Sequence, residues 1–188
     1  MTQVRPLYCT AHLARHRGFT IIELVVVILI TGILVATAAG RLMDRNVMDS
    51  RTFADQGGAL LRYAQKMAIS QNRDVWVVLA PGGIKLCYTK LCAPADRVPA
   101  PGGFNSESGA TSAFCASSAT WACEAPSSGV TLGATLNFYF DPVGKPFGNL
   151  DVSPTSVSSF GSALAVQVQS PGLADRVITV EAETGYVH

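Results

Sequence analysis

The stretch that decides the fold lies between residues 17 and 40 and begins Arg17-Gly18-Phe19-Thr20-Ile21-Ile22-Glu23-Leu24. From Phe19 to Gly40 the only charged side chain is Glu23. A helix needs roughly 20 apolar residues to cross a bilayer. Residues 19–40 are therefore predicted to form a helix long and apolar enough to span a membrane.

Charge is distributed unevenly around this apolar stretch. Residues 1–18 contain Arg5, Arg15 and Arg17 and no acidic residue. The chain as a whole has 14 Lys+Arg and 13 Asp+Glu, which leaves 11 basic and 13 acidic residues after position 18, a net charge of −2. A short basic segment before an apolar span stays in the cytoplasm. The sequence thus predicts a cytoplasmic N-terminus and an exported C-terminal part.

Three fates of the N-terminus are compatible with this pattern. A secretory signal peptide could be cut after Ala36-Thr37-Ala38, which has the small-x-small form. The stretch could instead remain as a permanent anchor, or the chain could be cut between Gly18 and Phe19.

Glu23 favours the cut before Phe19. A carboxylate inside an apolar span costs on the order of 2.5–3.5 kcal/mol on insertion scales, and a signal peptide has no use for it. A cut after Gly18 would create an α-amino group about one helical turn from Glu23. The amine and the carboxylate could then neutralise each other, within one chain or between neighbouring chains.

The motif from Arg17 to Leu24, followed by an apolar helix, resembles the prepilin cleavage and methylation motif of type IV pilins and type II secretion pseudopilins. The resemblance covers residues 15–40. It implies that a prepilin peptidase cuts after Gly18, that Phe19 becomes N-methylated by the same enzyme, and that Glu23 pairs with the terminal amine of an adjacent subunit. Gly40 departs from the family, in which many members have proline at this point.

The resemblance also implies partners and a location. The expected partners are the prepilin peptidase and N-methyltransferase, other pilins or pseudopilins in a hetero-oligomeric filament, and inner-membrane lipid. The protein would cross the inner membrane once, with its C-terminal domain in the periplasm, before it enters a pilus or pseudopilus. Residues 1–18 would be the leader, 19–40 the membrane and filament-core helix, and 41–188 the periplasmic domain.

The rest of the chain predicts an α+β domain. A long helix is expected over residues 19–72, because its second half carries an apolar stripe on one face: Phe53, Leu60, Leu61, Ala64, Met67 and Ala68. About five to seven antiparallel strands are expected to follow it, and the clearest candidates are rich in β-formers or alternate in polarity: 75–79, 84–88, 130–140, 162–169 and 176–182. The domain should therefore pack the helix on an antiparallel sheet, as a pilin does.

Three short motifs resemble the GspH/FimT type of minor pilin, which includes the MSHA-type minor pilins. They are Arg62-Tyr63-Ala64-Gln65 in the helix, Phe140-Asp141-Pro142-Val143-Gly144 in a turn, and Thr184-Gly185 near the end. Each is weak alone, and together they favour a minor component of the filament over a major pilin.

Four of the five cysteines lie in the exported part: Cys87, Cys92, Cys115 and Cys123. An even number in an oxidising compartment indicates two disulfides. Three connectivities are open, and proximity along the chain favours Cys87–Cys92 with Cys115–Cys123. A zinc site with four cysteine ligands is the alternative. Cys9 belongs to the leader.

No catalytic motif is found. The only histidine after the leader is His188, the last residue, and no nucleophile elbow, Walker loop or His-Glu-x-x-His is present. Neither a cofactor nor a metal site is expected, and a membrane-anchored periplasmic enzyme is disfavoured. Trp76 is expected in the core and Trp121 at the surface.

DNA capture by a FimT-like minor pilin is a further alternative to a structural role in the filament. It requires a basic patch near the C-terminal strands, and from Leu150 onward the only basic residue apart from the terminal histidine is Arg176. The net charge of −2 in the exported part also works against attraction to phosphate. DNA is therefore not an expected partner.

Overall fold

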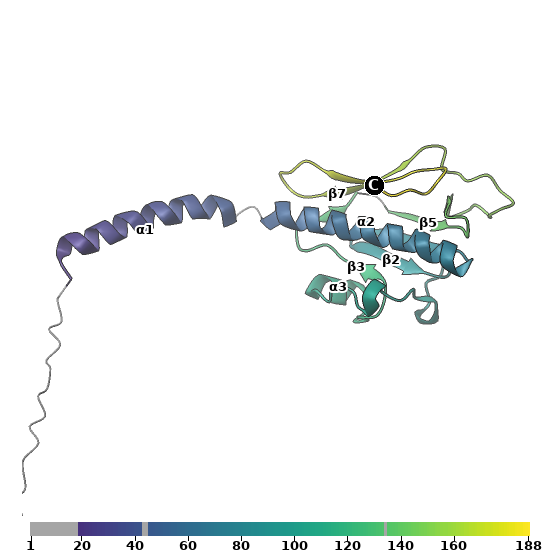
Figure 1. Ribbon diagram of the computed structural model, residues 1–188, viewed down its shortest axis with the longest axis horizontal. Coiled ribbons are helices and arrows are strands. Elements are labelled where there is room, and N and C mark those ends of the chain that lie inside the picture. Colours follow the sequence, from purple (N-terminus) through teal and green to yellow (C-terminus); the bar gives the residue numbers. More distant parts are fainter. Residues whose placement is uncertain (1–18, 43–44, 134) are drawn as a thin grey trace, which may run out of the picture. The chain divides into compact units, whose positions relative to one another are not determined.

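The computed structural model describes residues 19–42, 45–133 and 135–188, with only the backbone elements described for 37–42, 45 and 46 (Figure 1). The chain divides into two compact units, one up to Met43 and one from Asp44 to His188. The leader, including Gly18, lies outside the described residues.

The first unit contains helix α1, Ile21–Leu42. Thr20 is the N-cap of this helix. The Glu23 N–H donates to the Thr20 hydroxyl at 3.3 Å, and the Leu24 N–H donates to the Thr20 carbonyl at 3.2 Å. The helix continues through Gly40. The expected single helix over 19–72 is represented by α1 and by α2, Arg45–Gln71, and residues 43–44 between them lie outside the described residues.

The second unit packs α2 over two antiparallel sheets (Figure 1). The first sheet has the order β3-β2-β1-β5-β6 and the second has the order β4-β7-β8. This confirms the expected α+β fold. The strands are β1 Val75–Ala80, β2 Gly83–Cys87, β3 Cys123–Glu124, β4 Thr131–Leu132, β5 Leu136–Phe140, β6 Pro146–Gly148, β7 Leu164–Gln169 and β8 Arg176–Val180.

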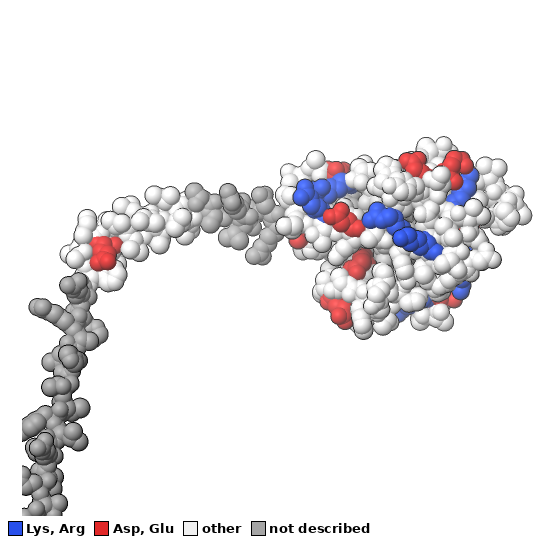
Figure 2. Space-filling view, viewed as in Figure 1, with Lys and Arg blue, Asp and Glu red and all other residues white. Residues whose placement is uncertain are grey.

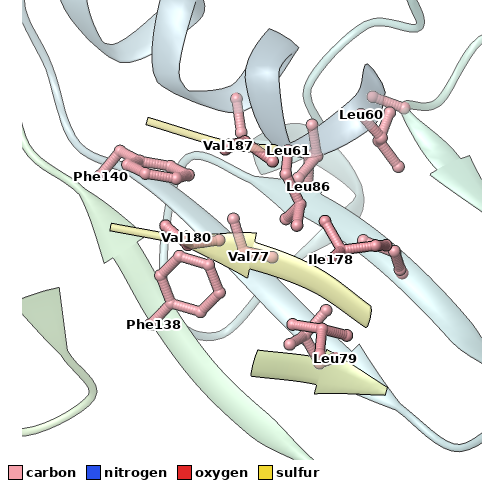
Figure 3. Close-up of a cluster of buried hydrophobic side chains, with 14 of the residues drawn as sticks. Leu60, Leu61, Val77, Leu79, Leu86, Phe138, Phe140, Ile178, Val180 and Val187 are labelled. Carbon is pink, nitrogen blue, oxygen red and sulfur yellow. The ribbon is translucent and has the colours of Figure 1, made fainter. Parts of the chain in front are cut away.

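One hydrophobic core lies between α2 and the sheets (Figure 3). Leu61 on the helix is fully buried, as is Val77 on β1, which is paired with Leu86 on β2 and with Phe138 on β5. The inward side chains of the strands alternate, as the period of two requires. Of the six residues in the expected helical stripe, only Met67 stays partly exposed.

The expected single strand over 130–140 is wrong. The chain forms β4 and β5 there, and the two strands belong to different sheets. Gly133 lies at the change, where its N–H donates to the Gln167 carbonyl at 2.9 Å and an added Cβ would lie about 3.1 Å from Gln169. The inward positions were still predicted correctly, since Leu132, Phe138 and Phe140 are all buried.

The two tryptophans differ from expectation, since Trp121 is buried and Trp76 is only partly buried. Trp121 is only 4% exposed, and its indole N–H donates to the Leu86 carbonyl at 2.8 Å. Trp76 lies on the side of β1 away from the main core and is partly exposed, with its ring 4.7 Å from that of Tyr139. Alternation along β1 decides this, because Val75, Val77 and Leu79 occupy the inward positions.

The three short motifs meet at one point of the domain. The Gln65 side-chain amide donates to the Gly144 carbonyl at 3.0 Å and to the Thr184 carbonyl at 2.8 Å. Asp141 shapes the first of these turns, because its carboxylate accepts the N–H groups of Val143 and Lys145 at 3.0 and 2.9 Å. We call Gln65 with these two turns the Gln65 clamp, and it joins α2 to segments about 80 and 120 residues away.

Gly185→Ala is expected to destabilise the domain more than Gly172→Ala. Both glycines have positive φ, +66° at Gly185 and +75° at Gly172. An alanine in this left-handed conformation destabilises the folded state by about 1–2 kcal/mol at either position. At Gly185 the new Cβ would also collide with the Gly144 carbonyl oxygen, whereas at Gly172 nothing lies within 4 Å. Chemical denaturation of the processed full chain in non-ionic detergent measures the free energy of unfolding of both variants. Equal losses of unfolding free energy would contradict the close packing of the clamp.

Candidate functional site

The first candidate site is the surface of α1. Every side chain from residue 19 to 36 is exposed in the protomer, and the large apolar ones range from 45% at Val25 to 84% at Ile21. The Thr31 hydroxyl is hydrogen-bonded within the helix, where it donates to the Val27 carbonyl at 2.8 Å and to the Ile28 carbonyl at 3.1 Å. The described part of the helix therefore offers an apolar surface on which the Thr31 hydroxyl is already hydrogen-bonded.

Glu23 is the only charged residue on this surface between Phe19 and Ala36. It occupies the third helical position after the Thr20 cap, where a carboxylate complements the positive end of the helix dipole. Phe19 precedes the cap and is 74% exposed. The described half of the expected processing site is thus open to a second molecule, and Gly18, the other half, lies outside the described residues.

No helix within the described ranges combines the length and the apolarity that a membrane crossing requires.

The second candidate site is the segment between β2 and β4, which two disulfides hold. Cys87 is bonded to Cys92 and Cys115 to Cys123, with Cα–Cα distances of 5.2 and 5.9 Å. The second bridge connects the end of helix α3, Gly109–Phe114, to β3. The cysteines therefore form two bonded pairs, and the alternative of one four-cysteine zinc centre is not what the structure shows.

Two cations pack on the aromatic rings beside these bridges. The Lys85 ammonium lies 4.1 Å from the centre of the Phe114 ring, and the Arg97 guanidinium lies 4.3 Å from that of Trp121. Burial lowers the pKa of Lys85, and the charge of Arg97 lowers it further. Trp121 and Phe114 in turn pack with the bridged cysteines in one hydrophobic cluster.

Asp141, Asp151 and His188 have structural roles in this domain. The Asp141 carboxylate holds its turn, and the Asp151 carboxylate accepts the N–H groups of Ser159 and Gly148, both at 2.7 Å, which lowers its pKa. His188 is paired with Glu181 at 3.1 Å. In the described part of the chain no group of three or more histidine, cysteine or acidic residues is placed to hold a metal ion.

Comparison with known proteins agrees with the apolar N-terminal helix. Residues 13–39 match the family model for the prokaryotic N-terminal methylation motif. Over 124 residues the chain is 31% identical to the type IV narrow pilus major component PilA5 of Thermus thermophilus, which covers 65% of this chain and 99% of the relative. The chain belongs to the type IV pilin family. Pilins are structural rather than catalytic proteins.

One solved structure with a similar course of the chain is the type IV minor pilin FimU of Pseudomonas aeruginosa. Its TM-score to this pilin is 0.43 at 15% sequence identity, and the match covers 73% of this chain and 90% of FimU.

Removing the bond between Cys115 and Cys123 is expected to destabilise the pilin domain. For a separation of eight residues, the loop-entropy relation gives about 2.5 kcal/mol. Urea unfolding of Cys115→Ala with Cys123→Ala, followed by tryptophan fluorescence, measures the loss. Thiol labelling of the oxidised wild type provides the control, and four labelled cysteines after residue 18 would contradict both bridges.

Gln65→Ala is expected to cost about 1–3 kcal/mol of unfolding free energy, because two backbone carbonyls lose their donor. Gln56→Ala is the matched control, since Gln56 is exposed on the same helix and its amide makes no hydrogen bond among the described residues. Thermal or denaturant unfolding compares the two. A Gln65 variant as stable as the Gln56 variant would show that the clamp is dispensable.

Proposed function

We propose that this pilin is a minor subunit that is processed by prepilin peptidase and assembled into a type IV pilus or a type II secretion pseudopilus, where it helps to initiate or prime the filament. Cleavage would fall between Gly18 and Phe19, and Phe19 would be N-methylated. The observation that supports the proposal most is the exposed apolar surface of α1 with its single carboxylate.

Before assembly, residues 19–40 would anchor the protein in the inner membrane, with the leader in the cytoplasm and residues 41–188 in the periplasm. Removal of the leader removes the arginines that hold the N-terminus in the cytoplasm. The helix can then exchange lipid for a bundle of similar helices, in which Glu23 finds the terminal amine of a neighbour. Since a lone carboxylate is costly in lipid, this pairing favours assembly.

The minor role rests on the three short motifs, and the Gln65 clamp gives those motifs a common structural purpose. PilA5 is a major component of its own pilus, so the minor role and the choice between pilus and pseudopilus belong to the proposal. The proposal includes no enzymatic activity, because the carboxylates and the histidine named above are engaged in turns and pairs.

Glu23→Val is expected to leave leader cleavage intact while lowering the amount of subunit in sheared filaments about tenfold or more, a factor that corresponds to about 1.4 kcal/mol. The cause is the loss of the partner for the terminal amine. Immunoblots of whole cells and of sheared filaments measure cleavage and incorporation separately.

Glu23→Gln keeps the shape of the side chain and isolates the effect of charge, and Val25→Ala controls for a change in the same helix. Normal incorporation of both Glu23 variants would reject the role assigned to this carboxylate.

A further inference from the structure

A groove between α2 and β8 brings three arginines together. It has a volume of about 330 Å³, and its lining includes Arg51 and Arg62 from the helix and Arg176 from the strand. More than a hundred residues separate Arg62 from Arg176, so the sequence alone shows them as isolated charges. Figure 2 shows blue Lys and Arg side chains over α2 with red acidic side chains between them.

Within the described part of the domain, these guanidinium groups have no ionic partner. Among the described residues the ion pairs are Lys145 with Glu183 and His188 with Glu181, and none of the three arginines takes part in one. The one hydrogen bond that these side chains make to described residues is long, from Arg62 to the Val187 carbonyl at 3.4 Å. Three guanidinium groups that can each bind a carboxylate through two hydrogen bonds are thus left available.

The groove has small and apolar residues in its lining as well as charges of both signs. Buried Gly58 and Ile178 and partly buried Ala54 belong to this lining. Asp55 and Asp175 line the same groove as the arginines. Arginines beside buried small or apolar residues are typical of protein interfaces.

We propose that this groove binds carboxylate side chains of a neighbouring subunit in the filament. The inference rests on the proposed function, since it needs a filament. The two aspartates in the lining and the net charge of −2 after the leader would repel a continuous polyanion such as DNA. A protein surface can instead place single carboxylates on the arginines and keep the aspartates in water.

The test uses the full chain in filaments sheared from cells. Charge reversal in the double variant Arg62→Glu with Arg176→Glu is expected to lower the amount of subunit in the filaments about tenfold. A tenfold change in an equilibrium corresponds to about 1.4 kcal/mol. Lys66→Glu is the matched control, because Lys66 is exposed on the same helix one turn from Arg62 and does not line the groove.

A second measurement identifies the partner group directly. Arg176→Lys keeps the positive charge and supplies an amine, so a carbodiimide can join it to a nearby carboxylate with loss of water. Mass spectrometry is expected to find residue 176 linked to an Asp or Glu of another subunit. Links only to Asp55 or Asp175 of the same chain would overturn the proposal.

The possible outcomes distinguish a failure of the groove proposal from a failure of the proposed function. Normal incorporation of the double variant, beside a wild type that assembles, would overturn the groove proposal alone. A cleaved wild type that never enters filaments would overturn the proposed function and the groove proposal with it. Retardation of a short DNA duplex by the purified full chain, lost in the double variant while incorporation stays normal, would replace the subunit with a nucleic acid as the occupant.

Discussion

The exposed apolar surface of α1 is the constraint on which the rest of this protein depends. Thirteen large apolar side chains between Phe19 and Val35 are exposed, and burying each contributes about 1.5–3 kcal/mol. Their sum exceeds the 5–15 kcal/mol by which a whole domain is usually stable. In the proposed function this surface is covered first by lipid and then by neighbouring helices, and Glu23 favours the second environment.

The domain from Asp44 to His188 is stabilised by its own internal contacts. Its core is closed by α2 on the two sheets, the Gln65 clamp ties the helix to two distant turns, and the disulfides hold the segment between β2 and β4. Each of these uses interactions within the domain alone. The surfaces that we propose for neighbouring subunits are the surface of α1 and the groove with the three arginines.

Much of this follows from local sequence pattern. The apolar stripe of α2 and the inward residues of the strands repeat with periods of 3.6 and 2, so the class of fold and most core positions could be predicted. The N-terminal methylation motif could also be predicted, because its residues are consecutive. What could not be predicted depends on contacts between distant segments. The break at Gly133 follows from the approach of β7, and the place of Trp121 follows from the hydrogen bond to Leu86. The grouping of Arg176 with Arg51 and Arg62 likewise exists only after β8 packs beside α2.

The most direct measurement of the central claim is the N-terminal mass of this subunit, taken from purified filaments by peptide sequencing and mass spectrometry. The account predicts a chain that begins with N-methylated Phe19 and retains the whole of α1. A chain that begins at Met1, or one that begins after Ala38 and so lacks the apolar helix, would contradict it.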